Sequence, residues 1–411
     1  MAKTNRKLWI ALPAMDEMEY LPAFFRCLGH QSFSGFHLVV NVNQPEAWWD
    51  DPQKRSVCEN NLLSLTYLKS RVDISMDIID CASPGRGMQG KRTGVGWARK
   101  IAMDRISEMA PENDILISLD ADTTFDADYF KSVIDNFNRK SKAVALSVPY
   151  YHMLTGDEEK DRAILHYEIY MRYYAINLWR IGNPFSFTAI GSAIALPVKT
   201  YQAIGGITPH QSGEDFYFLL KLRKYGEIIS WNPEKVYPAA RYSDRVGFGT
   251  GPAMIKGRAG EWSGYPVYPY RFFDEIKKTQ DLFPAIFEKD VSTPMDLFVA
   301  EKFGEESIWQ RLRENYKTKE NFIRACHHKI DAFRILQYLK WRNQSSTLKD
   351  EENLLQFLQK FFPDFVEEAP FDLRHFSFSV NPVTDLDYIR NRLIGIEDNY
   401  QRRHYVESEA I

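Results

Sequence analysis

Short apolar runs alternate with amphipathic stretches over the first 231 residues of the chain. Continuous apolar runs are typical of strands buried on both faces in a largely parallel sheet, and the amphipathic stretches between them predict helices packed on that sheet. The predicted strands are Leu8–Leu12, His37–Val42, Asp73–Ile79, Asp114–Leu119, Ala143–Val148, Ala189–Leu196 and Glu227–Trp231. The predicted helices are Glu17–Leu28, Gln53–Leu68, Val95–Met109, Asp126–Arg139, Lys160–Trp179 and Glu214–Lys224. The pattern therefore predicts an α/β domain.

The pattern changes near residue 241. Residues 241–270 are rich in Gly, Pro and aromatic side chains, which predicts a long functional loop. The residues beyond it are charged and helix-patterned, with predicted helices at Glu305–Tyr316, Lys319–Arg342 and Leu348–Phe362. Because 411 residues exceed the size of a single hydrophobic core, about 250–300 residues, we expect two domains. They are an α/β domain at 1–265 and a mainly helical C-terminal domain at 266–411.

Charge and hydropathy exclude several classes of protein. The formal charge is -3, with acidic and basic residues interspersed, so the chain has no basic face for nucleic acid. No stretch approaches the roughly 18 apolar residues of a membrane span, and the run at Leu8–Leu12 is too short for a signal peptide. The four scattered cysteines are expected to be reduced. We expect a cytoplasmic protein, with peripheral association at the inner face of the membrane left open.

Two carboxylates, Asp120 and Asp122, follow the predicted strand Asp114–Leu119. Ligands of open α/β sheets collect beyond the carboxyl ends of the strands. Carboxylate oxygens there suit a hard divalent cation, which neutralises a phosphate group. Asp-x-Asp-x-Thr is also a motif of haloacid-dehalogenase-type phosphatases, in which Asp120 would be the nucleophile. Acids that end a strand often serve only as helix caps.

Other segments give this pair a context. A strand ends in Pro-Ala with an acid beyond it, an arginine-bearing helix lies about 20 residues before the pair, and a glycine-containing strand and a Glu-Asp helix start follow it. In order, these residues are Pro13, Ala14, Glu17, Arg99, Gly191, Glu214 and Asp215. Together the segments resemble family 2 of the inverting glycosyltransferases, over roughly the first 250 residues. The resemblance implies a GT-A fold, with a Rossmann-like, mostly parallel sheet and flanking helices.

The resemblance also implies an activity and roles for residues. The expected enzyme is metal dependent, inverting and non-processive, and it moves a sugar from a nucleotide-diphosphate donor to a hydroxyl of a saccharide or other acceptor, in carbohydrate or cell-envelope biosynthesis. Asp122, with Asp120, would bind Mn²⁺ or Mg²⁺. Asp215, beside Glu214 as the second catalytic candidate, would be the general base. The nucleotide sugar would contact Pro13, Ala14, Glu17, Asn41, Asn43, Arg99, Asp120, Gly191, Arg241 and Arg245.

Some features depart from this family pattern. Asn41 and Asn43 stand where the family usually has an Asp, and the loop after residue 241 has no His, so a third metal ligand is unidentified. The dipole of the helix that Glu214 opens predicts a lowered pKa for Asp215. The oligomeric state, the donor sugar and the acceptor are not encoded in a pattern that we can read.

Three alternatives remain beside this interpretation. The first is the phosphatase that uses Asp120, and the second is an inactive sugar-nucleotide-binding module, motivated by Asn41 and Asn43. The third is a dinucleotide site, because residues 85–90 spell G-x-G-x-x-G, but they follow the third predicted strand and no acid ends a strand about 20 residues later. The aromatic stretch at 167–174 is better explained as the face of a core helix than as an acceptor or membrane contact.

Overall fold

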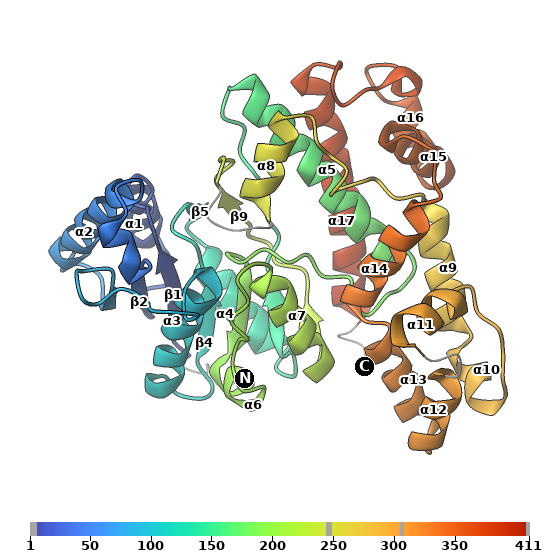
Figure 1. Ribbon diagram of the computed structural model, residues 1–411, viewed down its shortest axis with the longest axis horizontal. Coiled ribbons are helices and arrows are strands. Elements are labelled where there is room, and N and C mark those ends of the chain that lie inside the picture. Colours follow the sequence, from blue (N-terminus) through green and yellow to red (C-terminus); the bar gives the residue numbers. More distant parts are fainter. Residues whose placement is uncertain (1–5, 244–248, 305–307, 408–411) are drawn as a thin grey trace. The chain divides into compact units, whose positions relative to one another are not determined.

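The computed structural model describes residues 6–243, 249–304 and 308–407, which form two compact units (Figure 1). The first unit consists of Met1–Ile164, Phe187–Ala259 and Arg402–Ile411, and the second of Leu165–Ser186 and Gly260–Gln401. The division of the chain at residue 265 stays a prediction about which part folds independently. Within the described ranges, no helix combines the length and the apolar character that crossing a membrane requires.

A seven-stranded sheet forms the centre of the first unit, in the order β3-β2-β1-β4-β7-β6-β8. Strands β1 to β4 run parallel, whereas β7 is antiparallel to β4 and β6. All residues of β1 and β4 are buried, which explains their continuous apolar runs. The predicted α/β class with a mostly parallel sheet is confirmed. The strands are β1 (Leu8–Ala14), β2 (Phe36–Asn43), β3 (Met76–Cys81), β4 (Ile115–Ser118), β6 (Ala145–Ser147), β7 (Ile194–Pro197) and β8 (Ile228–Ile229).

Helices flank this sheet. Helix α2 packs against β2 and β3, and α3 packs against β1 and β2. All six helices predicted in the α/β region are present, and α3 has the predicted bounds. The short α6 directly follows β7 and was not predicted, because no turn residues separate the two elements. The helices of the first unit are α1 (Leu21–Gly29), η1 (Glu46–Asp50), α2 (Arg55–Ser70), α3 (Val95–Met109), α4 (Tyr129–Arg139), α6 (Val198–Ala203) and α7 (Glu214–Tyr225). Helix α5 (Glu158–Arg180) begins in the first unit and continues into the second from Leu165.

Three further elements of the first unit correct the sequence-based prediction. Strands β5 (Thr123–Phe125) and β9 (Val236–Pro238) form a separate antiparallel pair, too short to give a periodic signal. Helix α8 (Thr250–Arg258) lies within the stretch predicted to be a long loop. Glycines and Pro252 suggested a loop, but Pro252 lies in the first turn, where no intrahelical N–H bond is lost, and Ala253 and Met254 are fully buried.

The second unit is helical over its described residues, as predicted. The expected single helix Lys319–Arg342 is wrong, because Asp331 begins a new helix by accepting a hydrogen bond from the Arg334 backbone N–H over 3.2 Å. The second half of α5 supplies Tyr173, which is buried against Phe357 with ring centroids 4.9 Å apart and so confirms the core-helix interpretation. The elements are α9 (Tyr270–Asp281), α10 (Phe283–Glu288), α11 (Asp296–Phe303), α12 (Ile308–Asn315), α13 (Lys319–Lys329), α14 (Ala332–Asn343), α15 (Asp350–Phe361), α16 (Pro363–Glu367), η2 (Leu373–His375) and α17 (Val383–Glu407).

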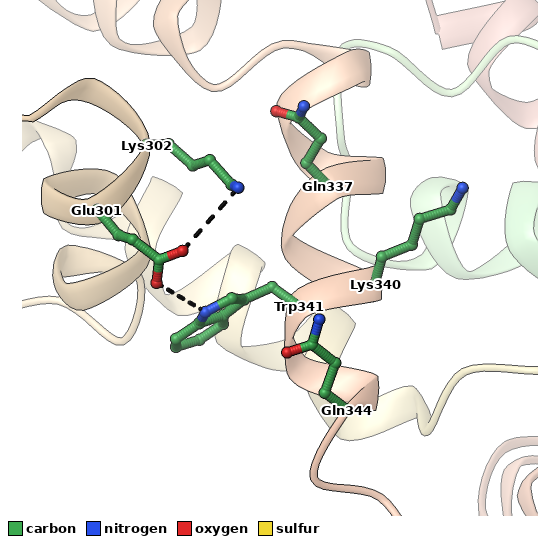
Figure 2. Close-up of a pocket in the computed structure, with 6 residues that line it drawn as sticks. All are labelled: Glu301, Lys302, Gln337, Lys340, Trp341 and Gln344. Atoms are coloured by element: carbon green, nitrogen blue, oxygen red, sulfur yellow. Dashed lines mark hydrogen bonds and ion pairs between the residues drawn. The ribbon is translucent and has the colours of Figure 1, made fainter.

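A hollow of about 380 Å³ lies between α11 and α14 in this second unit (Figure 2). Within it the indole N–H of Trp341 donates to Oε2 of Glu301 over 3.0 Å, so the polar edge of this ring is held by the protein. The lining residues are Glu301, Lys302, Gln337, Lys340, Trp341 and Gln344.

Candidate active site

The carboxyl ends of β1, β2, β3 and β4 meet at one edge of the large sheet, because these neighbouring strands are parallel. The chain beyond β4 is held close to β1, since the backbone N–H of Leu119 donates to the carbonyl of Ala11 over 3.1 Å. Asp120 follows directly. The edge is therefore where the predicted acidic pair lies.

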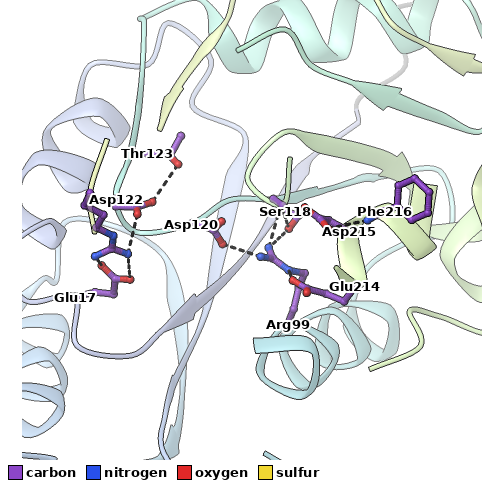
Figure 3. Close-up of polar contacts among 11 residues, drawn as sticks. Glu17, Arg99, Ser118, Asp120, Asp122, Thr123, Glu214, Asp215 and Phe216 are labelled. Carbon is purple, nitrogen blue, oxygen red and sulfur yellow. Dashed lines mark hydrogen bonds and ion pairs between the residues drawn. The ribbon is translucent and has the colours of Figure 1, made fainter. Parts of the chain in front are cut away.

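Arg99 on α3 is the centre of the first charged cluster (Figure 3). Its side chain is 2% exposed. Nη2 donates to Oδ1 of Asp120 over 2.9 Å, and Nε donates to Oε1 of Glu214 over 3.3 Å. Nη1 donates to the carbonyl of Gly191 over 3.0 Å and to the hydroxyl of Ser118. One guanidinium group on α3 thus contacts three other segments, which contain Ser118 and Asp120, Gly191, and Glu214.

Burial alone would lower the pKa of Arg99, but the carboxylates of Asp120, Glu214 and Asp215 raise it above its ordinary value. Arg99 therefore remains a cation. The role predicted for Arg99, in facing the nucleotide directly, stays a prediction.

Gly96 allows the loop that precedes α7 to approach α3. A Cβ atom at Gly96 would lie 2.1 Å from the carbonyl oxygen of His210, which no side chain could accept without movement. Gly96 lies three residues before Arg99 and therefore on the same side of α3. This close approach brings Glu214, four residues beyond His210, to the guanidinium of Arg99.

Asp215 follows Glu214 in the first turn of α7, and its Oδ1 accepts a hydrogen bond from the Phe216 backbone N–H over 2.7 Å. Desolvation, with the negative charges of Glu214 and Asp120, raises the pKa of Asp215 to about 7, against the opposing effects of the Phe216 N–H and Arg99. The lowered pKa expected from the helix dipole is wrong, because burial and neighbouring carboxylates outweigh the dipole. A pKa near neutrality suits a general base.

Arg241 is the centre of a second charged cluster, on the other member of the acidic pair. Its Nη2 lies 2.7 Å from Oδ2 of Asp122, and both terminal nitrogens donate to Glu17, over 2.6 and 3.0 Å. The guanidinium also lies over the ring of Tyr20, 4.6 Å from its centroid. The β5–β9 pair causes this arrangement, since the backbone N–H of Ala239, just after β9, donates to the carbonyl of Asp122. Arg245, which was also predicted to contact the nucleotide sugar, lies outside the described residues.

The two clusters bear on metal binding. Asp120 and Asp122 are each paired with a different arginine, and the described residues contain no group of three or more His, Cys, Asp or Glu side chains that could hold a metal ion. Acidic groups nevertheless exceed guanidinium groups here: Glu17, Asp120, Asp122, Glu214 and Asp215 against Arg99 and Arg241. This oxygen-rich, acidic set fits a hard divalent cation that takes its other ligands from phosphate and water.

The amides predicted to contact the nucleotide are buried in this structure. Asn41 is fully buried and donates to the carbonyl of Ala98 over 3.0 Å, which ties β2 to α3. Asn43 donates to the carbonyl of Ala14 over 3.1 Å, which ties β2 to β1. Pro13 and Ala14 are themselves buried in β1. Direct contact of these four residues with a nucleotide stays a prediction, and for the two amides it would require exposure that this structure does not provide.

Three residues of the two clusters were not identified from the sequence as site residues. Ser118 and Tyr20 contact the two arginines, and Gly96 permits the approach of α7. Ser118 did carry a signal, because it is the one polar residue inside the apolar run 115–119. Gly96 and Tyr20 carried none, since their roles depend on segments distant in the sequence.

The G-x-G-x-x-G segment has a different role from dinucleotide binding. The backbone N–H groups of Gly85 and Gly87 donate to the carboxylate of Glu46, over 2.8 and 2.5 Å. A Cβ atom at Gly87 would lie 2.6 Å from the Glu46 Cα atom. Gly85 and Gly87 therefore bind and pack against Glu46, the first residue of η1.

Residues 115–254 match the model of a glycosyl transferase family, Glycosyl transferase family group 2. The match starts at β4 and ends within α8, so it includes Asp120, Asp122, Asp215 and Arg241. The protein is therefore a glycosyltransferase. Within the α/β unit, these residues match a family 2 glycosyl transferase domain, and the match gives no support to the phosphatase alternative.

Several solved structures are similar to this chain. They include TarS 1–349 of S. aureus with UDP-GlcNAc (13% identity, 96% of this chain and 92% of that chain, TM-score 0.40). A mannosyltransferase of Pyrobaculum calidifontis with GDP-Man and Mn²⁺ has 12% identity over 96% and 88% of the chains, with a TM-score of 0.39. GalNAc-T7 with UDP, GalNAc and Mn²⁺ has 13% identity over 80% and 58%, also at 0.39. Similarity at this level does not define a donor or an acceptor for this chain. No curated protein sequence matches it.

Proposed function

We propose that this glycosyltransferase moves a sugar from a nucleotide-diphosphate donor to an acceptor hydroxyl with inversion at the anomeric carbon. Asp215 is the general base and marks the acceptor side of the site, where the attacking hydroxyl binds. Asp120 and Asp122 mark the donor side, where the nucleotide diphosphate binds. The observation that carries this proposal is the Arg99 cluster, which holds Asp120 of the acidic pair and the start of α7 at one place.

The reaction balances with Asp215 as the only proton acceptor. Its carboxylate takes the proton of the acceptor hydroxyl while that oxygen forms a bond to the anomeric carbon. The bond from this carbon to the diphosphate oxygen breaks, and the leaving nucleoside diphosphate keeps the electron pair. One displacement inverts the configuration. A pKa of about 7 means that much of Asp215 is ionised at neutral pH and still basic enough to take a proton.

The excess of carboxylates supports a divalent cation on the donor side. A diphosphate carries concentrated negative charge, and the two arginines are already paired with acids. Asp122 and Asp120 would hold Mn²⁺ or Mg²⁺, which would supply charge neutralisation to the departing diphosphate. Glu17 and Arg241 border this side, and Arg245 is proposed to join Arg241 at the diphosphate. Glu214, buried against Arg99, is proposed to act through Arg99 and not to touch the substrate.

A panel of nucleotide sugars tests the activity. The protein is incubated with UDP-, GDP-, ADP-, CDP- and dTDP-sugars, each with Mn²⁺, with Mg²⁺ or with EDTA, and release of the nucleoside diphosphate is followed. We expect slow hydrolysis of at least one donor that EDTA abolishes. Binding without turnover for every donor and every acceptor offered would instead favour the inactive sugar-nucleotide-binding module.

Replacing the base tests the mechanism. Asp215→Asn keeps the shape of the side chain and removes its basicity, so we expect transfer to fall by at least about 10²-fold while donor affinity changes little. Asp135→Asn is the matched control, because Asp135 is half-exposed on α4 and pairs with Lys131. Transfer by Asp215→Asn at the parent rate would show that another group removes the proton. A cytoplasmic location, with or without a peripheral membrane contact, stays a prediction.

A further inference from the structure

Arg99 contacts both halves of the proposed site. On the donor side it binds Asp120, and on the acceptor side it binds the carbonyl of Gly191 and the carboxylate of Glu214, the neighbour of the proposed base. We infer that Arg99 is a positioning residue that couples occupation of the donor side to the order of the acceptor side. This inference rests on the proposed function, because it needs a nucleotide diphosphate at Asp120.

The geometry requires a guanidinium group. Three different nitrogen atoms of Arg99 face three different directions: Nη2 faces Asp120, Nε faces Glu214, and Nη1 faces the carbonyl of Gly191. A planar fork holds these partners in fixed mutual orientation, whereas a lysine ammonium is a single point charge on a flexible stem. The hydroxyl of Ser118 accepts a hydrogen bond from Nη1 and also donates to the Gly191 carbonyl over 2.7 Å, which helps to fix the orientation of the guanidinium group.

The guanidinium of Arg99 is also closely packed against the backbone at Gly191. A Cβ atom at Gly191 would lie 2.6 Å from Nη2 of Arg99 and 3.5 Å from Oδ2 of Asp120. A side chain at residue 191 would therefore collide with the guanidinium in its present position, so only glycine lets this segment lie directly against Arg99. If the Arg99 guanidinium shifts at Asp120, the backbone at Gly191 must shift as well, because closely packed groups cannot move independently.

The coupling follows from competition for one cation. In this structure the charge of Arg99 is shared between Asp120 and Glu214. When the donor engages Asp120, that carboxylate attracts Arg99 less, and the guanidinium binds Glu214 and the Gly191 carbonyl more strongly. Donor binding thereby orders the loop that starts α7. Since coupling is reciprocal, an ordered acceptor side raises donor affinity by the same factor.

Hydrogen–deuterium exchange separates the two sides without a known acceptor. The full-length protein is mixed with Mn²⁺ and UDP, GDP, ADP, CDP or dTDP, and exchange is measured in residues 119–124 and 208–217. In the parent protein, the nucleotide that binds should slow exchange in both segments, by at least about 5-fold in 208–217, the lower end of typical coupling. In Arg99→Met the slowing at 119–124 should persist, and that at 208–217 should fall below about 2-fold.

Two further variants complete the test. Arg99→Lys keeps the positive charge and therefore tests the coupling even if Arg99→Met does not fold. In Arg99→Lys, the nucleotide should also fail to slow exchange in residues 208–217. Arg105→Met is the matched control on the same helix, because Arg105 is half-exposed and pairs with Asp77 and Glu108; it should behave as the parent. A full response at 208–217 in Arg99→Lys, or slowing at 119–124 alone in the parent, overturns the coupling but not the function. No slowing at 119–124 with any nucleotide contradicts the function and the coupling together.

Discussion

The carboxylate of Asp122 lies 2.7 Å from Nη2 of Arg241, so a proposed metal ligand is paired with a cation of its own chain. The same guanidinium binds Glu17 through two hydrogen bonds and lies over the ring of Tyr20. A divalent cation at Asp122 must therefore compete with Arg241. This competition should keep metal affinity low until a diphosphate contributes further oxygen ligands.

Arg241→Met tests this competition. Removing the guanidinium leaves Glu17 and Asp122 without that counter-charge, so we expect Mn²⁺ to bind the nucleotide-free protein roughly tenfold more tightly, equivalent to about 1.4 kcal/mol. Isothermal titration calorimetry with Mn²⁺ alone measures the change. The control is Arg258→Met, which removes a largely exposed arginine paired with Glu159. Equal Mn²⁺ affinities of parent and Arg241→Met would show that Arg241 does not compete with the metal.

The raised pKa of Asp215, about 7, predicts the pH dependence of transfer. The base works only when ionised, so kcat/KM should fall about tenfold for each unit of pH below 7 and level off above it. Initial rates measured between pH 5 and 9 at subsaturating donor give the profile. A plateau that continues down to pH 5 would exclude a base with this pKa.

Asp215 should also lower the stability of the fold at alkaline pH. Its carboxyl binds a proton more tightly in the folded chain than in the unfolded chain, where the pKa is about 4. Stability is therefore lost as the pH rises from about 4 through about 7. At pH 8, the free energy of unfolding of Asp215→Asn should exceed that of the parent by roughly 1 to 3 kcal/mol, which raises its Tm, and the gain should be smaller at pH 4.5. An equal Tm difference at both pH values would contradict the raised pKa.

Gly96→Ala should separate α7 from α3. The new methyl group would meet the His210 carbonyl at 2.1 Å, so we expect a loss of about 1–3 kcal/mol in unfolding free energy and a loss of transfer activity. Urea denaturation and a transfer assay measure both effects. Gly29→Ala is the control, because a Cβ at this α1 position meets no atom within 4 Å and alanine favours the helix. Wild-type stability and activity in Gly96→Ala would mean that the approach of the loop is not required.

Two arginines on α17 should differ sharply in their effect on the stability of the second unit. Arg390 is fully buried, with hydrogen bonds to Asp387 and to Glu168 of α5, whereas Arg392 is 38% exposed and pairs with Glu368. Arg390→Met should cost about 3–5 kcal/mol, because it leaves the fully buried Glu168 and the partly buried Asp387 without this partner. Arg392→Met should cost less than about 1 kcal/mol. Similar losses in urea denaturation of the two variants would contradict this distinction.

Much of the fold follows from local sequence. Runs such as Leu8–Leu12 are apolar throughout because both faces of β1 are covered, and this signal needs no knowledge of the partner strands. Helix α3 has the bounds that its pattern predicts, between Gly94 and Pro111. The short β5 and β9 escaped prediction, and so did α8, of which Ala253 and Met254 are buried, since burial and pairing with distant residues stabilise these elements more than their own propensities do.

The sequence by itself determined that the candidate acids stand where elements end or begin: Asp120 and Asp122 after β4, and Asp215 at the start of α7. Only the tertiary structure decided which cation each acid meets. Asp120 pairs with Arg99, and Asp122 pairs with Arg241. The folded environment raises the pKa of Asp215 to about 7, whereas its position in the first turn of a helix predicts a lowered pKa. The physical reason is that strand and helix patterns depend on neighbours along the chain, whereas ion pairing and desolvation depend on groups that only folding brings together.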